Sequence, residues 1–273
     1  DYFDQIQFQY SKVRFAKKFR SNIQNSKYIH LILNTQLSHF IGSNKTTQSA
    51  LCYSFSKKFT LNAKYFILAC GGIENSRTLL WTKEKSSSLI NPVLPIGKYW
   101  MTHPWILGGV GLLKKKKIKG FLQNNFIDEE GPLHFTATKK MLDNKNIFGG
   151  AIYMNAQEDT KIYKEIIKDI LCVAPEMGKK IARKIFSKDL KCGNIFMNLE
   201  EEANINNKIT LHKKLKDNIN MPITKLHYKK SKTTLLTAKT ILEEFGNTCR
   251  NLDLGRVAMQ DNIYNLESYE NLG

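Results

Sequence analysis

The sequence of 273 residues predicts an α+β protein. Three observations carry this prediction. Leu61–Trp81 contains an apolar run, then two glycines, then a helical pattern. Several short runs elsewhere are apolar or alternate between apolar and polar residues, and the second half contains two long helical patterns. A hydrophobic content of 42% is enough for a sizeable core. We expect an α/β part over residues 1–105 and a mixed or antiparallel sheet with helices over residues 106–273.

The first elements combine a helix with strands. Tyr10–Ile23 has apolar residues at helical spacing with basic residues between them, which predicts an amphipathic helix. Ile29–Leu33 predicts a strand that leads into Asn34–Phe40. Ala50–Phe55 and Lys58–Asn62 predict a β-hairpin.

A strand, a glycine turn and a helix follow the hairpin. Tyr65–Ala69 has the composition of a strand buried on both faces, and Gly71-Gly72 permits a sharp turn and close approach of a ligand to the backbone. Glu74-Asn75-Ser76 supplies acidic and capping residue types for a helix start. This pattern is typical of a cofactor crevice at the carboxyl end of a strand, and equally of an ordinary strand-to-helix turn.

The second half predicts more strands and two helical regions. Strands are expected at Gly108–Leu113, His134–Thr136, Ile147–Met154, Ile195–Leu199, Lys208–His212 and Ile223–Tyr228, the last three in one antiparallel sheet. The longest helical pattern, Lys161–Ser187, is interrupted by Pro175 and Gly178. Its apolar stripe predicts core packing, and a membrane surface is the alternative. Ser231 is expected to cap a helix that runs to Phe245 and ends at Gly246.

The net charge of +18, from 42 basic and 24 acidic residues, favours anionic partners. Lysines dominate and are spread through every segment, whereas arginine, the residue expected at base-reading contacts, is sparse. We therefore predict no nucleic-acid partner. The densest run, Lys114–Lys117 with Lys119, fits a solvated strand end, with a phosphate or membrane-surface contact as the alternative.

The cysteines predict free thiols in a reducing compartment, and hence a cytoplasmic location. They are odd in number, widely spaced and without a C-x-x-C pair, which also argues against a zinc site: Cys52, Cys70, Cys172, Cys192 and Cys249. The acidic run Glu200–Glu202 is expected to be an exposed loop, so no metal ligands are predicted. No run of about 18 apolar residues is present in the sequence.

Five stretches, in order, carry a resemblance to a known family. AKYFILACGGIENSRTLL, residues 63–80, resembles A-x-x-x-I-L-A-C-G-G-I-E-N-S/T-R-L-L-L of the glucose–methanol–choline (GMC) flavoprotein oxidoreductases. VRFAKKFRSNIQNSKYIHLILNTQL resembles R-F-G-x-x-Y-R-x-x-L … N-V-x-V-x-L-N-A-x-V, and IGKYWMTHP resembles V-G-R-x-F-M-x-H-P. NKITL with DNINMP resembles N-R-V-x-L … D-x-x-G-x-P, and Leu254-Gly255-Arg256 resembles a late L-G-R.

The resemblance implies an FAD-dependent enzyme that oxidises the CH–OH group of a small alcohol or sugar-like substrate by hydride transfer to the flavin. Carried over onto this sequence, the expected cofactor contacts are Leu37, Ala69, Cys70, Gly71, Asn75 and Arg77. In the family the catalytic histidine lies past the stretches matched here, so no catalytic residue is predicted. The family's H-P histidine packs near the flavin domain, which makes His103 a weak candidate for chemistry.

The resemblance also implies that the chain is an internal fragment, inactive by itself. The G-x-G-x-x-G fingerprint of a dinucleotide site is absent from the sequence. The sequence departs from the family pattern at three of these positions. Leu37 stands where the family has valine, a mild change at a backbone contact. Lys98 stands where it has arginine, which keeps the charge but loses the planar fork, and Asn220, which tolerates a positive φ, stands where it has glycine. Neither the substrate, the electron acceptor nor the oligomeric state follows from the sequence. The competing hypotheses are a basic module that binds anionic surfaces or nucleic acid without catalysis, and a truncated relative without turnover.

Overall fold

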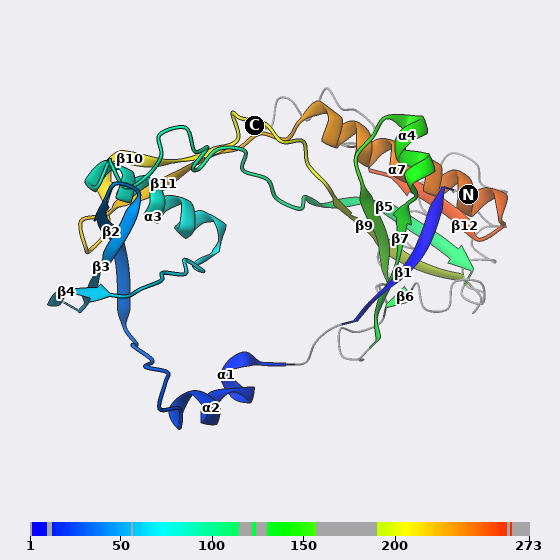
Figure 1. Ribbon diagram of the computed structural model, residues 1–273. Coiled ribbons are helices and arrows are strands. Elements are labelled where there is room, and N and C mark those ends of the chain that lie inside the picture. The colour runs from blue at the N-terminus through cyan, green and yellow to red at the C-terminus, as the bar shows by residue number, and fades with distance from the viewer. Residues whose placement is uncertain are drawn as a thin grey trace. The chain divides into compact units, whose positions relative to one another are not determined.

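The computed structural model describes residues 2–9, 13–55, 57–114, 122–123, 130–156, 190–260 and 263 (Figure 1). The chain has the predicted α+β fold, with helices and mainly antiparallel sheets. It divides into two compact units: unit 1 comprises Asp1–Lys12, Thr102–Glu202 and Lys230–Gly273, and unit 2 comprises Val13–Met101 and Ala203–Lys229. The segment Ala203–Lys229 therefore packs with the first part of the chain, although the sequence predicts it in the second part, residues 106–273.

Unit 1 is built on a seven-stranded sheet. The strands on its main path are β1 (Phe3–Gln9), β7 (Glu130–Ala137), β8 (Gly150–Ala156), β9 (Leu190–Leu199), β5 (Trp105–Lys114) and β12 (Gly255–Met259), in that order. The two-residue β6 (Leu122–Gln123) pairs with β8 in parallel, and the other pairings are antiparallel. The strands expected around residues 108–113, 134–136, 147–154 and 195–199 are confirmed within a few residues.

One face of this sheet makes the core of unit 1. On β9, Ile195, Met197 and Leu199 are buried at alternate positions, as the two-residue period of a strand requires. They share one apolar cluster with Ile241 and Leu242 of α7 (Lys232–Asn251). The short helix α4 (Lys139–Lys145) adds a fully buried methionine to the same cluster.

The start of α7 is as predicted, but its end is not. The Ser231 hydroxyl accepts a hydrogen bond from the Thr234 amide, which satisfies one of the donors that a helix start leaves without a partner. Gly246 does not stop the helix, which continues to Asn251. The reason is tertiary: Cys249, one turn beyond the glycine, is buried in the core and extends the apolar stripe.

Among its described residues, unit 2 combines a small sheet, one long and two short helices, and a separate hairpin. Its elements are α1 (Phe15–Lys18), α2 (Arg20–Gln24), β2 (Thr35–Ser43), β3 (Thr46–Ser54), β4 (Lys57–Asn62), α3 (Gly71–Lys85), β10 (Lys208–Lys216) and β11 (Pro222–His227). Strands β2, β3 and β4 form a three-stranded antiparallel sheet, which confirms the predicted hairpin. An apolar cluster around Phe40, Cys52 and Leu89 is the core of this unit.

Three expectations about the first elements are wrong. Tyr10–Ile23 holds two short helices, α1 and α2, without buried residues rather than one amphipathic helix. Ile29–Leu33 forms no strand, and Tyr65–Ala69 is not a strand either. A strand needs a neighbour to pair with, and no described segment pairs with either run.

The last three predicted strands do not share one sheet. β9 belongs to the seven-stranded sheet of unit 1, whereas β10 and β11 form a separate two-stranded sheet in unit 2. Periodicity identifies strands but not the sheet to which each strand belongs. The helical pattern at 161–187 and the lysine run at 115–119 lie outside the described residues.

None of the helices in the described part of the chain is both long and apolar enough to cross a membrane.

The core of unit 1 gives a direct test of this packing. Ile241 of α7 is fully buried, so Ile241→Ala should lower the free energy of unfolding by about 2–5 kcal/mol, the cost of lost burial and a residual cavity. Leu236→Ala, on the same helix but 45% exposed, should cost less than about 1 kcal/mol. Urea unfolding followed by circular dichroism measures both, and equal losses would contradict the assigned burial.

Candidate functional site

The start of α3 carries most of the predicted cofactor residues. Gly71 is exposed, has a φ of +83°, and would have no atom within 4 Å of an added Cβ. The residue before it, Cys70, makes no side-chain cap, so the first amides of the helix have no side-chain acceptor there. Backbone with open space beside it and free amides at a helix start is suited to an anionic group such as a phosphate.

Asn75 holds this turn in place. Its Oδ1 accepts from the Cys70 amide at 2.8 Å, and its Nδ2 donates to the Leu68 carbonyl at 3.3 Å. The side chain therefore ties the first turn of α3 to the last residues before the helix. These two hydrogen bonds hold the backbone around Gly71 without help from a neighbouring strand.

Arg77 is bound within the protein rather than pointing into open space. Its Nη2 lies 2.6 Å from the Asp217 carboxylate and 3.1 Å from the Met221 carbonyl, and its Nε donates to the Pro222 carbonyl at 2.8 Å. Its remaining contact is with Glu74, one turn back on α3. The side chain is only 12% exposed, so the guanidinium anchors the β10–β11 turn to the helix.

The β10–β11 turn is held by hydrogen bonds to one of its own side chains. The Asp217 Oδ1 accepts from the amides of Ile219 and Met221, both at 3.0 Å. Asn220 adopts a φ of +60°, as expected for the residue that stands in place of glycine. One carboxylate thus shapes the turn with one oxygen and binds Arg77 with the other.

The loop that follows α3, at Gly97–Trp100, pairs with the start of β10. The Ile209 amide donates to the Gly97 carbonyl at 2.6 Å, and the Trp100 amide donates to the Asn207 carbonyl at 2.8 Å. Gly97 has a φ of +73°, and an added Cβ would lie 2.5 Å from the Ile209 carbonyl oxygen. Glycine is required here for both conformation and close approach.

The other predicted residues lie close to this region or at the surface. Ala69 and Cys70 are exposed in the segment before α3, next to Leu68, which packs on the apolar cluster of unit 2. Leu37 of β2 pairs with Cys52 and packs on the same cluster. His103 is exposed outside any element. The structure thus brings Ala69, Cys70, Gly71 and Asn75 together. Arg77 instead binds Asp217 of the β10–β11 turn.

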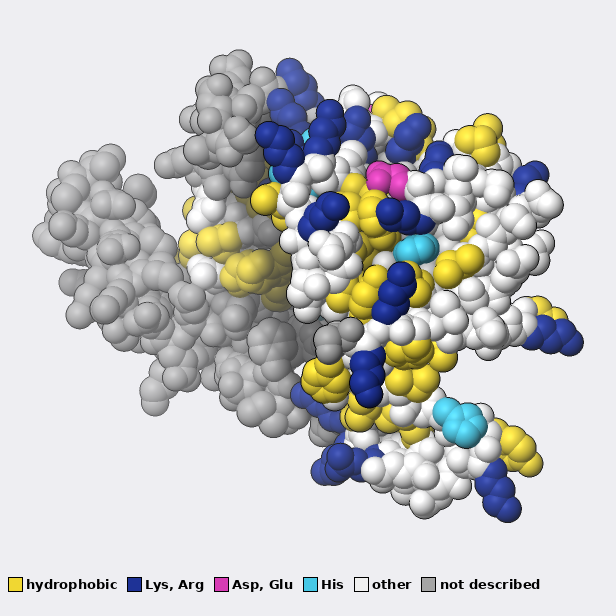
Figure 2. Space-filling view, turned by 90° about the vertical axis from the view of Figure 1, so that its left-hand side faces the viewer, with side chains coloured by type: hydrophobic (Ala, Val, Ile, Leu, Met, Phe, Trp, Pro, Cys, Tyr) yellow, Lys and Arg dark blue, Asp and Glu magenta, His cyan; other side chains and the backbone are white. Residues whose placement is uncertain are grey.

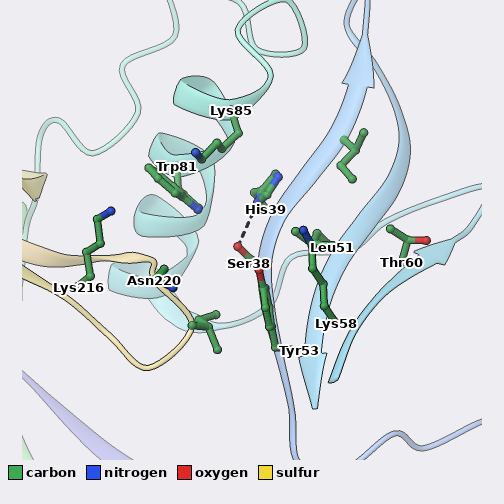
Figure 3. Close-up of a pocket in the computed structure, with 12 residues that line it drawn as sticks. Ser38, His39, Leu51, Tyr53, Lys58, Thr60, Trp81, Lys85, Lys216 and Asn220 are labelled. Atoms are coloured by element: carbon green, nitrogen blue, oxygen red, sulfur yellow. Dashed lines mark hydrogen bonds between the residues drawn. The ribbon is translucent and has the colours of Figure 1, made fainter. Parts of the chain in front are cut away.

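Sequence reasoning missed a groove of about 560 Å³ in unit 2, which we call the lysine groove (Figure 3). It is lined by Ser38, His39 and Ile41 of β2, Leu51 and Tyr53 of β3, Lys58 and Thr60 of β4, Trp81 and Lys85 of α3, Lys216 of β10, and Ile219 and Asn220 of the following turn. These residues share no spacing in the sequence, since they come from five elements and a turn. Only the overall lysine excess could have hinted at it.

His39 is the titratable group at the centre of the lysine groove. Its pKa lies below the ordinary 6.5, first because burial disfavours the charged form and then because Lys85 and Lys58 repel it. The Ser38 hydroxyl lies 3.0 Å from His39 Nδ1, which holds the ring in one orientation. At neutral pH the imidazole is therefore uncharged and able to act as a hydrogen-bond donor or acceptor.

Unit 1 carries an aromatic surface on the sheet face opposite α7. Trp105 stacks on Phe196 with ring centres 4.4 Å apart, and its Nε1 donates to the Tyr153 hydroxyl at 2.6 Å. These residues alternate along their strands with the buried core residues, which places them on the other face. His134 lies beside Tyr153 at 4.8 Å and is almost fully buried. Such a surface is suited to a flat or apolar ligand.

No cluster of three or more metal-ligating side chains is found among the residues that the structure describes. No protein-family model and no curated protein sequence matches the chain.

The Arg77–Asp217 pair can be tested by a double-mutant cycle. Arg77→Met and Asp217→Asn should each lower the free energy of unfolding by about 2–4 kcal/mol, because each leaves a largely buried partner without its hydrogen bonds. The double variant should lose clearly less than the sum. Glu74→Gln is the control: its contact is exposed, and its loss should cost less than about 0.5 kcal/mol. Additive losses in urea unfolding would show that the pair does not couple.

The described thiols should differ in reactivity. Cys70 is exposed, whereas burial raises the pKa of Cys52 and raises that of Cys249 to about 11. At pH 8 the two buried thiols stay protonated and unreactive, since alkylation needs the thiolate. Iodoacetamide labelling mapped by mass spectrometry should find Cys70 modified well before Cys52 and Cys249. Early modification of Cys249 in the folded chain would contradict its burial.

Proposed function

We propose that the chain is part of an FAD-dependent oxidoreductase of the GMC type that acts on the CH–OH group of a small alcohol or sugar-like substrate. The observation that carries the proposal is that three of the five stretches bearing the resemblance contact one another in unit 2. GGIENSR joins DNINMP through Arg77 and Asp217, and IGKYW joins NKITL through the bonds of Gly97 and Trp100. Weak matches scattered by chance would have no reason to contact one another in pairs.

The geometry at the start of α3 fits close approach of a dinucleotide. The Gly71 backbone is open on the side where a Cβ would stand, and the amides at the helix start have no side-chain acceptor from Cys70. We assign direct contacts to Ala69, Cys70 and Gly71, and a backbone contact to Leu37. Asn75 and Arg77 would act indirectly, one by holding the turn and the other by fixing α3 to the β10–β11 hairpin.

The exposure of the run before the double glycine supports a proposal that a further segment packs against it. Tyr65 and Ile67 are 79% and 91% exposed, although the run Tyr65–Ala69 has the composition of a buried strand. We propose that a further segment of a longer polypeptide, bearing the G-x-G-x-x-G fingerprint, pairs with this run. The chain alone would then be inactive, since neither the fingerprint nor the family's catalytic histidine segment is in its sequence.

The aromatic surface of unit 1 fits the role that the resemblance gives to this sheet. In the family, the strands of the second part roof the flavin ring and meet the substrate. Trp105, Tyr153 and Phe196 offer flat apolar faces, with the Tyr153 hydroxyl fixed by the indole of Trp105. When bound, the flavin would accept the hydride, and these side chains would pack against flat or apolar groups and exclude water.

Two further parts of the proposal rest on composition. Cys52, Cys70 and Cys249 are free, as expected in the cytoplasm, where we place the protein. A basic binding module is the second candidate, favoured by the lysines of the β10–β11 hairpin: Lys213, Lys214, Lys216 and Lys225. Figure 2 shows one face on which lysine and arginine side chains far outnumber acidic ones. Salt-sensitive retention on DNA by a colourless protein would favour that candidate.

The flavin test uses the complete product of the gene that encodes this chain. Purified in its native form, it should be yellow, with the absorption of oxidised flavin. Gly71→Asn should lose most of the bound flavin, because asparagine tolerates the positive φ but places a side chain in the open space. Gly246→Ala, a helical glycine whose added Cβ would have its nearest neighbour at 3.6 Å, is the control and should keep its flavin. A colourless product that binds no added FAD would overturn the proposal.

A further inference from the structure

We propose that the lysine groove binds a small molecule that carries a phosphate group, at a place separate from the flavin contacts proposed at the start of α3. Lys58, Lys85 and Lys216 line the groove from three different elements. No aspartate or glutamate is among its lining residues, and none of the three lysines has a carboxylate partner in the described part of the chain. Like charges gathered without a counter-charge repel, and an anion between them would relieve that repulsion.

The groove also offers hydrogen-bonding groups for phosphate oxygens. Ser38, Thr60 and Tyr53 contribute hydroxyls, and Asn220 contributes a side-chain amide. Figure 3 shows His39 between Lys58 and Lys85, with the bond to Ser38 fixing its ring. A neutral imidazole that can donate a hydrogen bond, flanked by two ammonium groups, suits a small dianion.

A simpler explanation accounts for only one of the lysines. Lys85 is the last residue of α3, where a cation is favoured by the helix dipole, and its ammonium lies 4.4 Å from the centre of the Trp81 ring. Neither effect applies to Lys58 on β4 or to Lys216 on β10. Neither effect explains why these two lysines lie in the same groove as Lys85, whereas an anionic ligand would.

The site is distinct from the flavin contacts proposed at the start of α3, whereas Leu37, the contact proposed on β2, directly precedes Ser38 of the groove. Trp81 and Lys85 belong to the last turns of α3, whereas Gly71 is its first residue. At a rise of about 1.5 Å per residue, the two ends of this helix are about 20 Å apart. Trp81 and Lys85 of α3 line one side of the groove, and Tyr53 and Lys58 of the three-stranded sheet line the other. A ligand here would be bound by unit 2 alone.

Phosphate binding to the intact chain can be followed through the His39 ring by NMR. Inorganic phosphate and glycerol phosphate, added at constant ionic strength, should bind saturably, with chloride as the control anion. The bound dianion should raise the pKa of His39, because it opposes the effect of the Lys85 and Lys58 ammonium groups on the imidazole. Lys216 is the other lysine that lines the groove.

Matched lysine variants make the test specific. Lys58→Gln and Lys85→Gln should each weaken phosphate binding about fivefold, the effect of one charge pair at a solvated site. Lys57→Gln, one residue away on β4 but not lining the groove, should bind as the parent does. Circular dichroism checks that each variant is folded, which is expected since Lys58 and Lys85 are exposed.

Three results would overturn the proposal. These are no saturation by either probe, an equal loss in Lys57→Gln, or a His39 pKa that does not rise on addition of phosphate. An equal loss in the control would mean that phosphate follows the overall charge rather than the groove. Flavin content of the complete gene product should not change in Lys58→Gln, so failure of this site and failure of the flavin proposal are separate outcomes.

Discussion

Unit 2 depends on one buried ion pair. Arg77 reaches from α3 to the turn between β10 and β11 and binds a carboxylate and two backbone carbonyls there. Asp217, its partner, uses its second oxygen to shape that turn. Because the two residues are 140 positions apart, this pair closes a very long loop and makes the hairpin part of the same unit as α3. The free-energy cost of removing both charges from water is offset by the several hydrogen bonds that each side chain makes.

The choice of arginine follows from geometry. The donors on Nε and Nη2 point in fixed directions and meet a carboxylate and two carbonyls at once, which a single lysine ammonium could not do with the same orientation. At Lys98 the sequence departs from the arginine of the family pattern, and there the contacts in the structure are made by backbone instead. The Gly97 carbonyl and the Trp100 amide hold that loop to β10. A backbone pairing tolerates the change of side chain, whereas the fork at Arg77 would not.

Local features could be predicted from the sequence, and distant ones could not. The β3–β4 hairpin, the Ser231 cap and the positive φ of Asn220 each depend on a few neighbouring residues. The end of α7 depended instead on the burial of Cys249, and the separation of β10 and β11 from the sheet of β9 does not follow from the strand pattern. The lysine groove draws on five elements and a turn, so no spacing in the chain could indicate it.

Tyr65–Ala69 shows how composition and conformation can separate. Its apolar residues predict a buried strand, but a strand forms only beside a partner that accepts its hydrogen bonds, and the described chain offers none. The turn that follows does not share this dependence. Asn75 binds the loop at Leu68 and Cys70, so the backbone at Gly71 keeps its shape without a neighbouring strand. A turn shaped in this way would lower the entropy cost of binding a ligand there, and the proposed pairing of Tyr65–Ala69 with a further segment would bury its exposed apolar side chains.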